Sequence, residues 1–179
     1  MNAIEALAYT IQTDVASILS RYRPPPPVIR PLDSAGHLLP PSPPPMPQRR
    51  TDDTFAPSRP SGMPVHGHVS SVFGVQRRTH RHNGEDIAAP RGTPVLATAA
   101  GHCIGAEAHA GYGNMVTLDH GGGYVTRYAH LGLMLCAPGE QIDRGQVVGL
   151  VGTTGHSTGP HLHYEVLVHN HFTDPKAYL

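Results

Sequence analysis

The spacing of apolar residues divides this chain into three segments, and the first is typical of an amphipathic helix. Between residues 3 and 21, apolar side chains recur every three or four positions, as on one face of an α-helix. A helix this short has no core of its own, so its apolar face is expected to pack on the main domain, on a second copy or on a partner protein. We predict a helix over residues 1–22, with its apolar face formed by Ile4, Leu7, Ile11, Val15, Ile18 and Leu19.

Proline dominates the second segment, residues 23–60. Runs such as "RPPPPVIRP" and "PPSPPPMP" remove backbone donors and fix φ, so neither a helix nor a central strand can form there. The expected structure is a disordered or extended linker of polyproline type. We interpret it mainly as a spacer. The alternative is that the proline runs bind an aromatic groove of a protein partner.

The third segment, residues 61–179, consists of short β-rich runs separated by glycine turns, and no helical periodicity of useful length follows residue 61. The stretch "MVTLDHGGGYVTRYAHL" predicts a hairpin, because glycine supplies the positive φ that a tight turn needs. About 120 residues suffice to bury a core unaided. We therefore predict one mainly β domain.

Charge and hydropathy exclude several classes of partner. Thirteen acidic residues balance thirteen basic ones, which removes the electrostatic reason to expect nucleic acid. No run approaches the roughly 18 apolar residues of a membrane span. The N-terminus lacks the basic start and continuous apolar core of a secretory signal, so no export route is visible.

The two cysteines, Cys103 and Cys136, do not form a C-x-x-C pair, so a zinc ribbon or a redox motif is not expected. We favour two buried thiols. The alternative is one disulfide in an oxidising compartment.

Histidine, with fourteen copies, is the unusual feature of the composition, and three motifs of the β domain combine it with charged or glycine neighbours: "HRHNGED", "RYAHL" and "GPHLHYE". In a strand, His161, His163 and Glu165 would share one face because side chains alternate. His82 and Asp86 lie four positions apart with a glycine between them. Catalytic zinc sites use three His or carboxylate ligands plus water, so His82, Asp86 and His163 are the candidate ligand set.

In addition, the β domain resembles the lysostaphin-type, or LytM-like, zinc metallopeptidases that cut peptide cross-links of bacterial peptidoglycan. The resemblance covers residues 61–179 almost end to end. It is carried, in order, by "SSVFG", "HNGEDIAAPRGTPVLATAAG", "GYGNMVTLDHGGGYVTRYAHL", "GEQIDRGQVVGLVGTTGHSTGPHLHYEV" and "DPKAYL".

The resemblance implies a fold and a set of site roles. The fold would be an open, barrel-like sandwich of antiparallel sheets, similar to a duplicated hybrid motif, with the metal in a groove. His82, Asp86 and His163 would hold one Zn²⁺ whose fourth position is water. His130 and His161 would be the catalytic pair, and a peptidoglycan peptide would be the substrate.

The implied activity is that of a zinc endopeptidase working in the cell envelope, the periplasm or outside the cell. One alternative is a catalytically silent LytM-like regulator of other cell-wall hydrolases. Degenerate copies lack site residues, whereas all five expected positions are filled here. A carrier or phosphotransfer domain is a further alternative; a carrier needs a lysine on a hairpin tip, and the one lysine, Lys176, lies near the C-terminus.

Residues around the motifs receive secondary expectations. Glu165 either orients a metal ligand or forms a structural pair. His80 is expected in a solvated loop, Glu85 on the surface, and His120 in a structural turn. Asn114 and Tyr128 are expected to line the substrate groove. We assign its walls to the linker after "GHCIGAEAHAGYG" and to the loop "LGLMLCAPGE".

Overall fold

The structure is a computed structural model that describes residues 56–77 and 80–179. The predicted helix over residues 1–22 and residues 23–55 of the predicted linker lie outside this range and stay predictions. The last linker residues, 56–60, already contact the domain, since Ser58 N donates a hydrogen bond to His120 O. No helix in the described ranges is long and apolar enough to cross a membrane.

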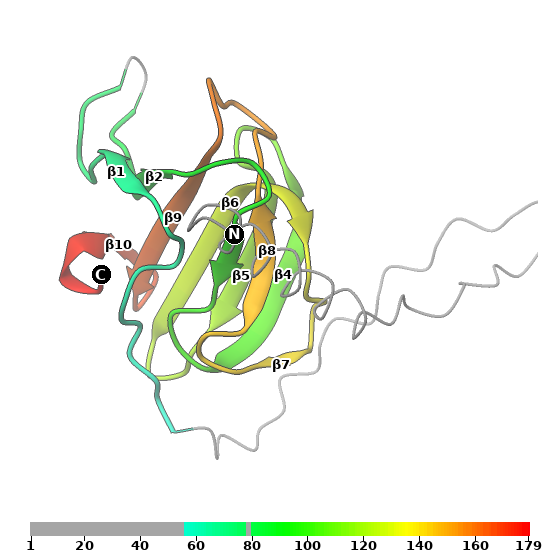
Figure 1. Cartoon of the computed structure of the whole chain (residues 1–179). Coiled ribbons are helices and arrows are strands. Elements are labelled where there is room, and N and C mark those ends of the chain that lie inside the picture. Colours follow the sequence, from blue (N-terminus) through cyan, green and yellow to red (C-terminus); the bar gives the residue numbers. More distant parts are fainter. Residues whose placement is uncertain (1–55, 78–79) are drawn as a thin grey trace, which may run out of the picture. The chain divides into compact units, whose positions relative to one another are not determined.

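The described residues form ten strands and one 3-10 helix, so the prediction of a mainly β domain is confirmed (Figure 1). In chain order these elements are β1 His68–Ser71, β2 Glu85–Ala88, β3 Pro94–Leu96, β4 Gly101–His109, β5 Gly113–Asp119, β6 Tyr124–Met134, β7 Gln141–Ile142, β8 Val147–Val151, β9 His161–Val168, β10 His171–Thr173 and η1 Pro175–Ala177.

All strand pairs are antiparallel, and the strands connect into one open, branched sheet. The main path runs β1-β2-β9-β6-β5-β4-β7, while β10 pairs with β9 and β8 links β3 to β6. Figure 1 shows β9, β6, β5 and β4 side by side along this path. The predicted hairpin is present as β5 and β6, and its turn contains three glycines with positive φ, Gly121, Gly122 and Gly123.

The core lies on one face of the central strands, where Tyr128 of β6 is paired with Tyr164 of β9 and both are fully buried. Their rings are 5.4 Å apart, and both hydroxyl groups lie within 3.1 Å of Thr98 Oγ1. Burying a phenol without a partner is unfavourable, so this shared threonine satisfies two polar atoms inside an apolar core. The expectation that Tyr128 lines the groove is therefore wrong, because the alternation of β6 turns its side chain into the core.

His120 is also a core residue, as its predicted structural role requires. Its ring is fully buried, with Nδ1 2.8 Å from Ala100 O and Nε2 2.8 Å from Thr126 Oγ1. Burial lowers the pKa of this imidazole, because the charged form is disfavoured away from water.

Candidate metal centre and catalytic groove

The register between β2 and β9 builds the site. Asp86 is paired with His163, and Ala88 is paired with His161. Directly opposed residues of an antiparallel pair project on the same face, so a carboxylate meets one imidazole and a small methyl group leaves room beside the other. The predicted alternation of "HLHYE" is thus confirmed as a strand face.

Three side-chain atoms converge at this face. His82 Nε2 lies 3.0 Å from Asp86 Oδ1 and 3.1 Å from His163 Nδ1, and the third distance, from His163 Nδ1 to Asp86 Oδ1, is 2.8 Å. All three residues are buried, and they form a group that could hold a metal ion. Ligands 2.0–2.1 Å from a tetrahedral zinc ion lie roughly 3.3 Å from one another, so the donor atoms are close to the required spacing.

The outer partners of the two imidazoles favour a metal over a simple hydrogen-bond cluster. His82 Nδ1 lies 2.8 Å from the carbonyl oxygen of Val72, which can only accept, so this nitrogen carries the proton. His163 Nε2 lies 3.0 Å from Glu165 Oε1 and donates to that carboxylate in the same way. In the neutral tautomers two lone pairs and a carboxylate oxygen therefore point at one another, which is the donor set that zinc binds. The residues present fit the ion.

Electrostatics at the cluster agree with this donor set. Burial tends to raise the pKa of Asp86, but its contacts with the imidazoles of His163 and His82, which donate to the carboxylate when they are protonated, outweigh burial and hold this pKa well below its usual range. Burial tends to lower the pKa of His163, but hydrogen bonds to Asp86 and Glu165 outweigh it and raise the pKa. Without a cation, a proton is thus drawn to the position between the donor atoms.

Glu165 lies behind the cluster and is completely buried. Its Oε1 accepts hydrogen bonds from His163 Nε2 and, at 2.8 Å, from Tyr112 Oη, while Oε2 pairs with Arg127 Nη1 at 3.3 Å. Glu165 therefore combines the two roles that the sequence left open: it orients His163 through Oε1, and it forms a structural ion pair with Arg127 through Oε2. Tyr112 was not identified from the sequence.

A second pair of imidazoles, His130 and His161, lies beside the cluster with ring centroids 4.7 Å apart. His161 Nδ1 donates to Gly159 O at 2.8 Å, and its Nε2 lies 3.8 Å from Asp86 Oδ1. His130 Nδ1 donates to Thr154 O at 2.7 Å. Both rings therefore keep Nε2 free of a proton in their neutral form.

A bulge in β6 brings His130 to this face. From Tyr128 to Leu131 the strand advances three residues, while its partner β5 advances only two, from Val116 to Asn114. His130 has a φ of 59°, a left-handed conformation that is uncommon for a residue with a β-carbon. Such bulges redirect side chains next to active sites. Simple alternation would have placed His130 on the core face with Tyr128.

A groove of about 720 Å³ is lined by all four of these histidines. It is lined by β1 and the loop that follows it, by residues 110–112, and by the loop before β9. Neither predicted wall lines the groove. Residues 110–112 belong to the end of "GHCIGAEAHAGYG", the segment after this stretch is strand β5, and no residue of "LGLMLCAPGE" is a lining residue. His80 is exposed at the rim, as expected, and Arg77 and His156 are lining residues that the sequence motifs did not reveal.

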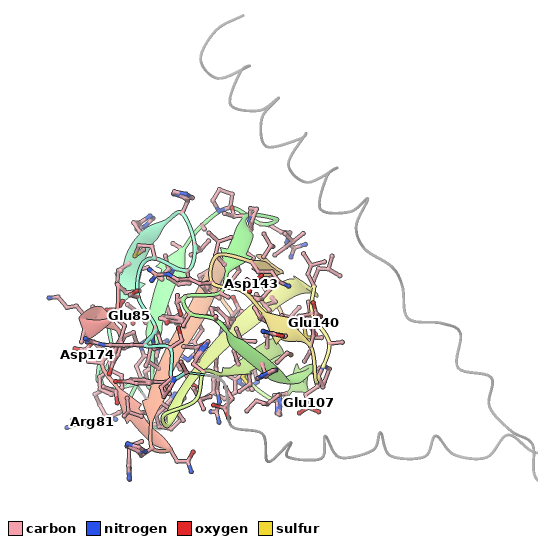
Figure 2. All side chains as sticks on the ribbon, turned by 90° about the horizontal axis from the view of Figure 1, so that it is seen from below. Arg81, Glu85, Glu107, Glu140, Asp143 and Asp174 are labelled. Carbon is pink, nitrogen blue, oxygen red and sulfur yellow. The ribbon has the colours of Figure 1, made fainter. Side chains whose placement is uncertain are left out.

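Two further expectations need correction. Glu85 is buried rather than on the surface, because it pairs with Tyr164 on the face opposite Asp86, and that face is covered. Burial raises the pKa of Glu85, and the nearby charge of Asp174 adds to this effect; Figure 2 labels both residues. Asn114 does not line the groove but donates from Nδ2 to Leu131 O at 3.1 Å, which ties β5 to β6.

Cys103 is buried and Cys136 half-buried, and both are free thiols with their sulfur atoms 3.6 Å apart. The favoured prediction of two thiols agrees with this arrangement.

The antiparallel fold and the His–Asp donor set together define a metallopeptidase of lysostaphin-like architecture. The chain belongs to peptidase family M23, whose model matches residues 80–175. It is 47% identical over 94 residues to the peptidoglycan DD-endopeptidase ShyA of Vibrio cholerae, a match that covers 52% of this chain and 22% of ShyA.

Solved structures agree with the family. A zinc-containing peptidase from Vibrio cholerae superposes with a TM-score of 0.58 at 38% identity, covering 65% of this chain and 37% of the other. The catalytic domain of the antimicrobial peptidase lysostaphin from Staphylococcus simulans gives a TM-score of 0.59 at 29% identity, covering 63% of this chain and 91% of that domain.

Proposed function

We propose that this protein is a zinc-dependent endopeptidase that hydrolyses peptide cross-links of bacterial peptidoglycan. The observation that carries the proposal is the convergence of His82, Asp86 and His163 next to a second pair of imidazoles in an open groove. Family membership and the similarity to a peptidoglycan endopeptidase support the reaction class and the substrate.

In this proposal, His82 Nε2, Asp86 Oδ1 and His163 Nδ1 hold one Zn²⁺ and a water takes the fourth position. When bound, zinc polarises the scissile carbonyl and lowers the pKa of the attacking water. Glu165 keeps the ring of His163 oriented through Nε2, and Val72 O does the same for His82. The ligand atoms are thereby held in place by groups that cannot rotate freely.

His130 and His161 carry out the proton transfers. Each ring is fixed by a hydrogen bond from Nδ1 to a backbone carbonyl, so Nε2 is the atom that accepts or donates a proton in the groove. Burial lowers the pKa of His130, and this keeps its imidazole neutral and able to accept a proton near neutral pH. Between them the two rings accept the proton of the attacking water and protonate the leaving amine or stabilise the oxyanion.

We place this activity in the cell envelope or outside the cell, where peptidoglycan is found. The alternative of a silent regulator is disfavoured, since both the ligand positions and the catalytic positions carry functional side chains.

The experiment is digestion of purified peptidoglycan sacculi by the full 179-residue protein, with muropeptides measured by mass spectrometry. We expect cross-linked species to decrease with zinc present, and to persist when a chelator is added. The exposed residue His171 on β10 supplies the control His171→Ala, which should digest like the wild type. Sacculi left intact by protein that holds one zinc ion would contradict the proposal.

A further inference from the structure

The loop between β1 and β2 carries Arg77 to the groove. This loop folds back on itself through backbone hydrogen bonds from Gly74 N to His82 O and from His82 N to Val75 O. Arg77 N in turn donates to His80 O at 2.8 Å. The arginine is therefore held on the same short segment that supplies the His82 imidazole.

The guanidinium of Arg77 contacts Asp86, one of the three candidate metal ligands. Its Nη2 lies 2.5 Å from Asp86 Oδ2 and 3.1 Å from Ser71 Oγ. The Arg77 side chain is 39% exposed, whereas that of Asp86 is 10% exposed, so the cation lies where the buried site meets solvent. A guanidinium has five N–H donors, and both bonds use Nη2, so Nη1 and Nε have no acceptor among the described residues.

The charge of the groove is unbalanced once zinc is present. Among the described residues that line it, Asp86 is the only carboxylate and Arg77 the only arginine or lysine. A divalent ion, one carboxylate and one guanidinium leave an excess of positive charge in the groove. A substrate group that carries negative charge is favoured at this place.

We propose that Arg77 is a specificity-determining residue that binds a free α-carboxylate on the amino acid whose nitrogen forms the scissile amide. This inference rests on the proposed function. Asp86 contacts His163 through Oδ1 and Arg77 through Oδ2. The guanidinium is therefore separated from the proposed zinc position only by the carboxylate group of Asp86. The planar fork of arginine matches a carboxylate through two parallel hydrogen bonds. Cross-links in which the leaving residue keeps its carboxylate are therefore preferred over uncharged bridges.

A purely structural role for Arg77, holding Asp86 in one orientation, makes a different prediction. Loss of such a role would weaken the binding of every substrate equally. Loss of carboxylate recognition would weaken only the binding of substrates that carry the charge. The ratio of the two affinities, rather than either affinity alone, separates the two roles.

The probes are two D-alanyl-D-alanine analogues in which a non-cleavable ketomethylene replaces the amide, one with a free C-terminal carboxylate and one with a carboxamide. Their dissociation constants are measured by calorimetry on the full zinc-loaded chain, with zinc content determined in each sample. We expect the wild type to bind the acid about tenfold or more tightly than the amide, because hydrogen bonds to charged groups have such an effect. Arg77→Gln should reduce this ratio to about twofold, and Arg77→Lys should give an intermediate ratio.

Arg81→Gln is the matched control, since Arg81 lies on the same loop but does not line the groove, and Figure 2 shows it at the periphery. It should keep the wild-type ratio. An unchanged ratio in Arg77→Gln, an equal loss of affinity for both probes, or no preference in the wild type would each overturn the inference. Because neither probe is cleaved, the result is independent of hydrolysis: a preference in a protein that digests no sacculi would contradict the proposed function alone.

Discussion

Asp86 lies opposite His163 in the pairing of β2 with β9, and its Oδ1 atom is 2.8 Å from His163 Nδ1. The two residues are 77 positions apart in the chain, so strand register alone brings them together. Since a slip of β9 by one residue would turn each of its side chains to the other face, both the core pair Tyr128–Tyr164 and the candidate metal-ligand group depend on how β9 is placed between β2 and β6.

Replacement of Glu165 tests the support of the metal ligand. Glu165→Gln removes the carboxylate that accepts from His163 Nε2, so zinc affinity should fall by about 10–100-fold. Competition with a chromogenic chelator measures the affinity. The control is Glu107→Gln, because the Glu107 side chain is 68% exposed and should leave zinc binding unchanged. Equal affinity in wild type and Glu165→Gln would show that His163 does not need this partner.

Replacement of Gly84 tests how closely the "HNGED" turn approaches β9. A β-carbon at this position would lie 2.3 Å from Tyr164 O and 3.0 Å from His163 Cε1, so the backbone must shift. Gly84→Ala should destabilise the protein by about 1–3 kcal/mol and weaken zinc binding. Gly105→Ala, whose β-carbon would make only ordinary contacts at 3.8 Å, should be tolerated. Denaturant unfolding compares the two; equal stabilities would refute the predicted clash.

After reduction and removal of the reductant, Cys103 and Cys136 are expected to titrate as two thiols. Oxidised glutathione should then convert them to one intramolecular disulfide, and the glutathione is itself reduced to two thiols. Their sulfur atoms are 3.6 Å apart across a sequence separation of 33 residues. Closing a loop of this size should stabilise the folded state by about 3–4 kcal/mol in the chain-entropy account. Mass spectrometry and thermal unfolding measure the bond and its effect, with Cys136→Ser as the control. Thiols that stay fully titratable in the oxidised, unfolded sample would contradict this expectation.

The buried imidazole of His120 should make the free energy of unfolding depend on pH. Burial lowers its pKa from the ordinary value of 6.5, so the unfolded chain binds this proton at a higher pH than the folded protein does. The contribution is therefore complete above pH 6.5 and is lost as the pH falls through 6.5 toward the lower folded value. The free energy of unfolding should fall less steeply between pH 8 and pH 5 in His120→Gln than in wild type or the exposed control His171→Gln. Parallel curves would assign the acid sensitivity to other groups.

Much of the site was predictable from local patterns. Strand alternation placed His161, His163 and Glu165 on one face, and the spacing of His82 and Asp86 around a glycine indicated a shared ligand site. These features depend on the chemistry and spacing of neighbouring residues, which a sequence displays directly.

Other parts of the site depend on tertiary geometry. The bulge that redirects His130 arises from unequal advance of β5 and β6, and nothing in "RYAHL" signals its φ of 59°. Glu85 was expected on the surface. Its side chain lies on the face opposite Asp86, and only packing reveals that this second face is covered. Arg77 is one of three arginines in "QRRTHR", and its role follows from how the loop folds back.

The central claim is that one histidine cluster holds zinc while the neighbouring pair performs the proton transfers. It is tested most directly by measuring bound zinc and the rate of cross-link cleavage in His163→Ala and His161→Ala. The account predicts that His163→Ala loses both, because a ligand atom is removed, whereas His161→Ala keeps one zinc ion and loses cleavage by about 100-fold or more. Near-normal turnover in His161→Ala would contradict the account.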